Sequence, residues 1–276
     1  MKKVIIALDG ANFPKGAFEF AKFINGQNEI LLAGIFLSPI DYSIMMSFSG
    51  GVEGLATMPE LTNKNEDEEI VNRNIHQFEK ACLADGLHYR VHKDVDLMAL
   101  SSLVEETRFA DVLLVSSELF FKNVESAQPN YYLEELLKKS ECPVMLIPEK
   151  FEAPQQILLS YDGGESSIHA IKQFAYLFPE LLEKETTMVS VTEDDNEELP
   201  GYNMMSELLG SHYPRLQLHH LKMEKKKFFV EWLSEQPNSF IVMGAFSRSM
   251  FSELFKKSFA KDVIRQVKMP LFISHK

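Results

Sequence analysis

The chain has 276 residues, of which 45% are hydrophobic and 25% are charged, and its formal net charge is -12. These proportions are typical of a globular protein with room for about two domains. The negative charge disfavours general nucleic-acid binding, because a phosphate backbone would be repelled. The apolar run 4–8 ends at Asp9, too soon for a signal peptide, and no run is long enough to span a membrane.

Strands and helices alternate along the first half. Short apolar runs bounded by turn residues predict buried parallel strands at 4–8, 30–36, 112–115 and 144–147. Between them, apolar residues recur at helical spacing over 15–24, 69–84 and 98–108. The acidic run 66–69 is interpreted as a solvated helix start or loop. Such alternation predicts right-handed βαβ units and a parallel sheet.

The second half has the same alternation. Strands are expected at 157–160, 187–191, 217–221, 240–243 and 271–274, and helices at 166–177, 226–235 and 253–267.

Three short sequence segments of the first half each have a similar counterpart in the second half. KKVIIALDG at 2–10 matches QQILLSYDG at 155–163, ADVLLVSS at 110–117 matches NSFIVMGA at 238–245, and CPVMLI at 142–147 matches MPLFIS at 269–274. The repeated unit is therefore a whole domain. The sequence predicts domains at 1–148 and 154–276, joined by a linker at 149–153.

The first copy is the longer one, and we assign its extra residues to 43–65, a segment rich in Gly, Ser and Met. Two interpretations remain open for this segment. It is either a surface excursion without a fold of its own or a flexible flap over the end of the sheet or over the partner copy.

Each copy places an Asp-Gly pair directly after its first strand, at Asp9 and at Asp162-Gly163. Ligands of open parallel sheets bind at the carboxyl ends of the strands. A carboxylate there could accept hydrogen bonds from an adenine amino group or a ribose hydroxyl, or it could cap the next helix. Later in the second copy, Gly244 and several serines lie between a strand and a helix, a context in which backbone N–H groups can hold phosphate.

Taken in this order and twice over, these features resemble the universal stress protein family in its tandem form. The resemblance covers almost the whole chain except 43–65. It implies an α/β fold of two tandem Rossmann-like (adenine nucleotide alpha hydrolase-like) domains. Each would hold a five-stranded parallel sheet flanked by helices, and the two would pair through their last strands. It also implies a ligand site formed by Asp162, Gly163, Val191, Gly244, Ser247, Lys257 and Ser258, with Asp9 as a weaker candidate.

ATP-binding members of that family carry the pattern G-x2-G-x9-G-[S/T] after the fourth strand. On the second copy, Gly244 and Ser258 match, whereas Ser247 and Lys257 replace two glycines. Glycine matters there because a backbone without Cβ can approach phosphate closely. Lys257 has three interpretations: a solvent-facing residue at a helix start, a built-in cation that fills the phosphate site, or a partner of bound phosphate.

The first copy departs further from the pattern. Ser116 stands at the first glycine, and no glycine follows it before 142. Asn130 falls near the third glycine, one residue late, and the bulky residues Phe120, Phe121, Tyr131 and Tyr132 stand where backbone should lie open. The sequence predicts an occluded or repurposed site in this copy.

Other chemistries have weaker support. Adjacent His219 and His220 lie in a predicted strand and should face opposite ways, so no metal site is expected. His88 and His92 are separated by a segment that is also typical of a strand. No hydrolase or Walker motif is complete. Cys82 and Cys142 lie far apart and fit a reducing cytoplasm.

The leading expectation is a cytoplasmic, non-catalytic binding or regulatory protein of the stress response, with nucleotide binding weakened or lost. The first alternative is an ATP-binding switch with slow hydrolysis through the second domain, ATP being the candidate ligand. The second is a small-molecule binder that uses the first domain. Expected partners are the two domains themselves, a second chain in a homodimer and an unidentified protein, with no nucleic acid or membrane.

Overall fold

A computed structural model describes residues 1–9, 12–37, 64–94, 99–122, 130–192, 201–222, 226–244 and 264–274. The predicted excursion 43–65 lies outside these residues, apart from Lys64 and Asn65, which begin a helix.

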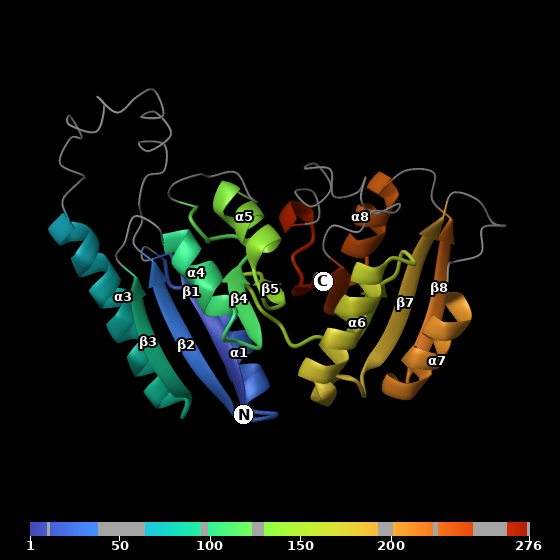
Figure 1. Cartoon of the computed structure of the whole chain (residues 1–276), viewed down its shortest axis with the longest axis horizontal. Coiled ribbons are helices and arrows are strands. Elements are labelled where there is room, and N and C mark those ends of the chain that lie inside the picture. The colour runs from blue at the N-terminus through green and yellow to red at the C-terminus, as the bar shows by residue number, and fades with distance from the viewer. Residues whose placement is uncertain are drawn as a thin grey trace, which may run out of the picture.

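All described strands belong to one ten-stranded sheet in the order β3-β2-β1-β4-β5-β10-β9-β6-β7-β8 (Figure 1). Within each half every described strand pair is parallel, and β5 and β10 meet antiparallel at the centre, with Met145 opposite Phe272. The predicted pairing through the last strands is confirmed. The strands are β1 (Lys2–Leu8), β2 (Ile30–Leu37), β3 (His88–Asp94), β4 (Val112–Ser116), β5 (Val144–Ile147), β6 (Gln156–Ser160), β7 (Glu185–Thr192), β8 (Leu216–Lys222), β9 (Ser239–Gly244) and β10 (Leu271–Ser274).

Helices cover both faces of the sheet, because successive strand residues point to opposite faces and both sets are apolar. One buried cluster joins Val4 and Ile6 to α1, α3, α6 and α7, and the other joins Ile5 and Ala7 to α4, α5 and α8. The helices are α1 (Lys15–Asn25), α3 (Lys64–Ala84), α4 (Ala99–Thr107), α5 (Tyr131–Lys139), α6 (Glu165–Leu177), α7 (Tyr202–His212) and α8 (Lys226–Ser234), with a short 3₁₀ helix at Pro179–Leu181.

The predicted strands and helices within these residues are confirmed, with shifts of a few residues at their ends. The acidic run 66–69 lies in the first turns of α3, where negative charge favours a helix. Of the helix expected at 253–267, residues 264–267 are described, and 264–266 of them are helical. Helices α5 and α7 were not predicted. The predicted domain boundaries fall between β5 and β6 and stay a prediction.

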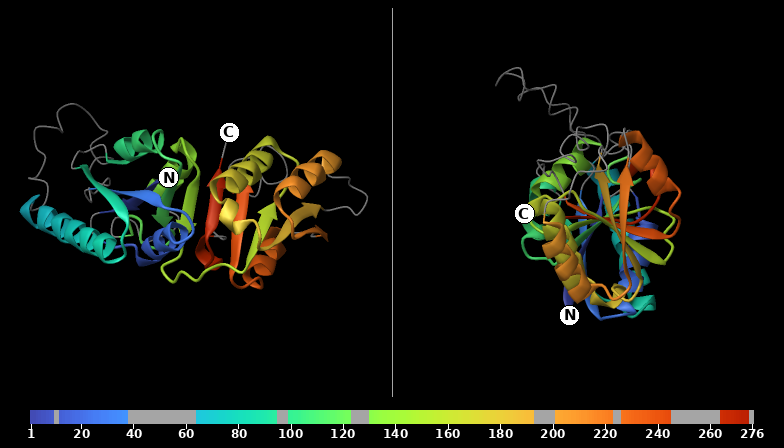
Figure 2. Two further views of the ribbon diagram at one scale, coloured as in Figure 1. Left: turned by 90° about the horizontal axis from the view of Figure 1, so that it is seen from below. Right: turned by 90° about the vertical axis from the view of Figure 1, so that its right-hand side faces the viewer.

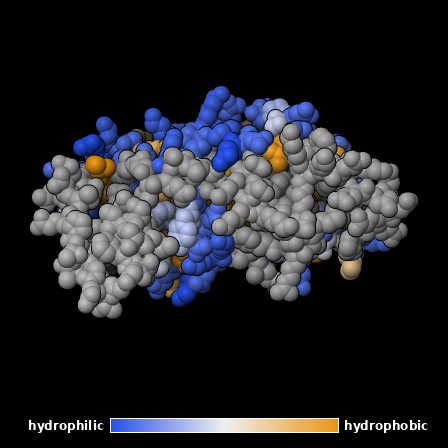
Figure 3. Space-filling view, turned by 90° about the horizontal axis from the view of Figure 1, so that it is seen from above, coloured by the Kyte–Doolittle hydropathy of each residue, from blue (hydrophilic) through white to orange (hydrophobic). Residues whose placement is uncertain are grey.

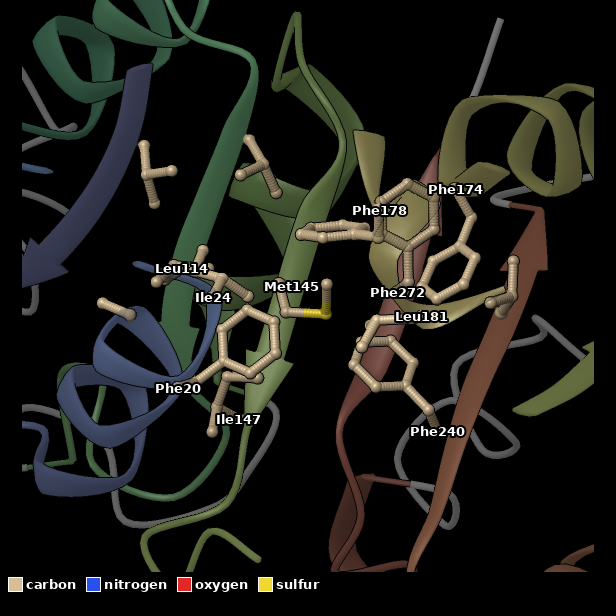
Figure 4. Packing of buried hydrophobic residues seen from close by; sticks show 14 of the residues in the cluster. Phe20, Ile24, Leu114, Met145, Ile147, Phe174, Phe178, Leu181, Phe240 and Phe272 are labelled. Carbon is tan, nitrogen blue, oxygen red and sulfur yellow. The ribbon is translucent and has the colours of Figure 1, made fainter. Parts of the chain in front are cut away.

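The two halves share one hydrophobic core across the β5–β10 seam (Figure 4). Phe20 of α1 packs against Phe178 and Phe240 of the second half, with ring centroids 6.2 and 6.0 Å apart. Lys2 adds an ion pair with Glu180 at 2.9 Å. Figure 2 shows the halves side by side, with β10 in the middle of the molecule.

Seen from above, the described surface is mostly hydrophilic, and its hydrophobic atoms are scattered (Figure 3). Within the described part of the chain, no helix combines the length and the hydropathy needed to cross a bilayer.

Candidate functional site

Both Asp residues lie where ligands of open α/β sheets bind. Within each half the strand order reverses at the first strand, because β1 lies between β2 and β4, and β6 lies between β7 and β9. Asp9 directly follows β1, and Asp162 lies two residues after β6. The two side chains therefore occupy equivalent positions at the carboxyl ends of the half-sheets.

The Asp9 carboxylate is buried and bound to the protein's own donors. The residue is only 4% exposed. Asn12 donates to it twice, from its backbone N–H to Oδ1 at 2.9 Å and from Nδ2 to Oδ2 at 3.1 Å. The backbone N–H of Phe121 donates to Oδ2 at 3.0 Å. A carboxylate oxygen that a ligand would use as an acceptor is thus already bonded to Phe121, which lies 112 residues away in the sequence.

Phe121, whose backbone N–H donates to Asp9, belongs to a packed group of aromatic rings. Phe121 stacks on Tyr132 with ring centroids 4.1 Å apart, and Phe120 lies edge-on to Phe121 at 4.8 Å. All three residues are at most 5% exposed, whereas Tyr131 is 47% exposed. Phe121 adopts a left-handed backbone, φ 51°, which is uncommon for a bulky residue. This strain is held in place by the packing and the hydrogen bond to Asp9.

Asn130 links the aromatic residue Phe120 to the start of α5 through hydrogen bonds. It is fully buried, and its Oδ1 accepts from the Leu133 N–H at 2.9 Å as the N-cap of the helix. Its Nδ2 donates to the Phe120 carbonyl at 2.6 Å. The sequence places Asn130 near a phosphate-binding glycine; here its side chain binds the protein itself.

Asp162 has a more open setting. It is partly exposed, and its Oδ1 accepts from the Gly164 N–H at 2.8 Å and from Ser167 Oγ at 2.7 Å. Gly164 and Ser167 lie at the start of α6, so Asp162 stabilises the helix N-terminus. Gly163 needs its lack of Cβ, because its φ is 78°. Capping and ligand binding were alternatives for this carboxylate, and the capping contact is present.

Gly244 has a packing reason for being glycine. A Cβ there would lie 2.4 to 2.7 Å from backbone atoms of Ser166 and Ser167. The end of β9 therefore touches the first turn of α6, which also receives Asp162. The sequence predicts that the absence of a Cβ at Gly244 lets a phosphate approach. Among the described residues, it is the backbone of α6 that approaches this glycine.

Position Ser116, the counterpart of Gly244 in the first half, takes part in a carboxylate network. Its Oγ donates to Glu149 Oε1 at 2.7 Å, and the Glu149 N–H donates to Glu118 Oε2 at 2.8 Å. Burial raises the pKa of Glu149, and hydrogen bonds from Ser116 and the Lys15 backbone only partly offset it. Partial burial acts to raise the pKa of Glu118 as well, but hydrogen bonds from Lys268 and the Glu149 N–H outweigh it and lower that pKa.

The remaining predicted site residues have less structural support. The backbone of Val191 lies in β7, paired with Leu221 of β8. Ser247, Lys257 and Ser258 lie outside the described residues, so the interpretations of Lys257 stay open. Sequence reasoning missed Asn12 and Ser167, although an Asn or Ser shortly after Asp-Gly is a recognisable turn or cap signal.

The histidines behave as predicted for strand residues. His219 and His220 are exposed on β8, and His220 Nδ1 lies 2.9 Å from Ser190 Oγ on the neighbouring strand. His88 and His92 belong to β3 and contact Glu29 and Glu106. Across the described ranges, no three His, Cys, Asp or Glu residues converge as a metal site would require.

Comparison with known proteins identifies the fold. No protein-family model matches the chain, and no curated protein matches it by sequence. Among solved structures, a universal stress protein from Archaeoglobus fulgidus DSM 4304 is 15% identical with a TM-score of 0.68, over 100% of this chain and 96% of that one. A candidate universal stress protein from Pseudomonas aeruginosa UCBPP-PA14 is 12% identical with a TM-score of 0.58, over 100% and 93%. A functionally unknown protein from Pseudomonas aeruginosa PAO1 is 11% identical with a TM-score of 0.56, over 100% and 92%. The chain has the two-copy α/β fold of universal stress proteins.

Proposed function

We propose that this chain is a tandem universal stress protein of the stress response, which binds a ligand or partner without chemical turnover. The ligand binds in the second half. In the first half the equivalent position at Asp9 is occupied by the protein's own groups, so this half has a structural role. The fold supports the family, and the contrast between Asp9 and Asp162 supports the division of roles.

The state of the Asp9 carboxylate carries this proposal. To bond to Asp9, an adenine or ribose group would have to displace the Phe121 N–H, and Phe121 is itself held by its stack on Tyr132. Leaving a buried carboxylate without its donors costs about 1–3 kcal/mol or more. The same packing argues against a small-molecule site among these aromatics.

An adenine nucleotide is the class of ligand that the resemblance offers for the second half. Asp162 is partly exposed there, at the strand-order reversal. Two of three phosphate-loop glycines are replaced, by Ser247 and Lys257, so we expect the affinity for ATP to be weak or absent.

We place the protein in the cytoplasm, since Cys82 and Cys142 are free, buried thiols. The β5–β10 pairing already uses the strands that the family resemblance assigns to dimerisation. A homodimer or an unidentified protein partner would therefore need a different surface.

Isothermal titration with Mg-ATP, together with an assay for ADP release, tests the proposal. We expect at most one ATP per chain and no sustained ADP production. Where binding is detected, Asp162→Asn should weaken it by about tenfold, since the substitution removes the negative charge and turns one acceptor into a donor. A matched first-half variant, Phe121→Leu, should leave affinity unchanged.

Two ATP molecules per chain, or a loss of affinity with Phe121→Leu alone, would contradict the closed first half. Steady ADP release would favour the ATP-binding switch instead. If wild type does not bind ATP, Lys257→Gly separates the interpretations of that lysine: restored binding indicates that Lys257 fills the phosphate site.

A further inference from the structure

A cavity of about 440 Å³ lies at the seam between the two halves. Its walls include Glu118 after β4, Ser234 at the end of α8, and Gln266 and Lys268 ahead of β10. The connection between β5 and β6 lines one side with Lys150 and Glu152. Cavities of this size at domain interfaces commonly hold small molecules.

The charges around this seam cavity are balanced and paired. Lys268 contacts Glu118, and Lys150 contacts Glu152 at 2.9 Å. Glu118 is committed to the protein, because its second oxygen accepts from the Glu149 N–H. Each ammonium has three donors, so Lys150 and Lys268 retain capacity for another acceptor.

The Lys150–Glu152 pair is the part that can change partners. Their side chains are 89% and 54% exposed, and such a pair contributes at most about 1 kcal/mol. A ligand that offers one carboxylate and one ammonium can replace both halves of this pair at little cost. A ligand with only one charge can engage either Lys150 or Glu152, but not both.

We propose that the seam cavity binds a small zwitterion of the α-amino acid class. Its carboxylate is held by Lys150 and Lys268, and its ammonium by Glu152. Two of these three charges come from the covalent connection between the halves, so the site is specific to the tandem chain. The proposal does not depend on whether the second half binds a nucleotide.

The test is a calorimetric and thermal-shift screen of the full chain against each standard amino acid. At least one should bind and raise the melting temperature. For that compound, the N-acetyl derivative and the carboxamide, which each lack one charge, should bind at least about tenfold more weakly. Inorganic phosphate serves as the anion control and should not bind at the site.

Three variants locate the binding. Lys150→Gln with Glu152→Gln removes the exchangeable pair, and Gln266→Trp fills the cavity from an exposed position. Each should weaken binding about tenfold or more. Glu19→Gln with Lys22→Gln removes a comparable exposed pair on α1 and should change nothing.

Absence of binding by every amino acid would overturn the proposal. So would binding that survives both seam variants, or an N-acetyl derivative that binds as tightly as its parent. All variants replace exposed or partly exposed residues, and an unchanged melting temperature without ligand verifies their folding.

Discussion

The carboxylate of Asp9 holds donors from Asn12 and Phe121, and both of its oxygens are used. Such a residue has no neutral isostere, because an amide would turn one acceptor into a donor that faces another donor. Asp162 differs, since the Gly164 N–H and Ser167 Oγ both donate to Oδ1, an acceptor that asparagine keeps.

We therefore predict that Asp9→Asn lowers the free energy of unfolding by about 1–3 kcal/mol. Asp162→Asn should lower it by less than about 1 kcal/mol, the contribution of a charge at a helix N-terminus. Urea denaturation of the two variants provides the measurement. Equal losses would mean that the two carboxylates have equivalent structural roles.

Two glycines, Gly244 and Gly210, differ in how much room the structure leaves for a Cβ, so their alanine variants can be compared. A Cβ at Gly244 meets backbone at 2.4 Å, whereas at Gly210, inside α7, it meets nothing within 4 Å. We predict that Gly244→Ala destabilises the protein by about 1–3 kcal/mol or more. Gly210→Ala should stabilise it by about 0.5–1 kcal/mol, because alanine favours the helix. Thermal unfolding of both variants tests this, and a neutral Gly244→Ala would refute the close approach of β9 to α6.

At the scale of elements, α1, β4 and the segment after β5 meet at Glu149. Burial raises the pKa of this carboxyl, so the folded state binds its proton more tightly than the unfolded state does. The resulting stability is fully present below the unfolded pKa, about 4.5, and is lost as the pH rises through the raised folded pKa.

Glu149→Gln should therefore make the protein more stable than wild type at neutral pH, since glutamine keeps an oxygen for Ser116 without the buried charge. The difference should shrink below the unfolded pKa, where wild-type Glu149 is protonated. Denaturant unfolding across this pH range is the measurement. A stability difference that stays constant across this pH range would contradict the role given to the buried charge.

Much of the element order was predictable because buried parallel strands and amphipathic helices have local signatures. Helix α5 has a weak local signature, since it is only nine residues long and begins where the family pattern places the end of a phosphate loop. The closed state of Asp9 could not be predicted in detail. It depends on a left-handed Phe121 and on a contact across 112 residues, neither of which leaves a local pattern.

For the whole molecule, the shared core predicts that both halves unfold together. Trp232 reports on the second half, and Cys82 and Cys142 report on the first. Burial raises the pKa of both thiols to about 12, so they should resist alkylation until the fold opens. We predict coincident urea transitions by Trp232 fluorescence and by thiol labelling.

Phe20→Ala, which empties part of the seam, should lower the stability by about 3–5 kcal/mol and move both transitions together. The exposed Phe109→Ala is the matched control and should have little effect. Transitions that separate in wild type would show that each half is stable alone.

The sequence by itself determined that a whole α/β unit is repeated, that an aspartate follows the first strand of each copy, and that the last strands carry apolar runs able to pair. These features are encoded in short segments with a regular period, so they can be read without knowing what lies beside them. Only the tertiary structure decided that the Phe121 N–H binds Asp9, that the start of α6 packs against Gly244, and that the connection between the halves lines a cavity. Each of these depends on segments far apart in the chain that meet only when the two copies pack into one sheet.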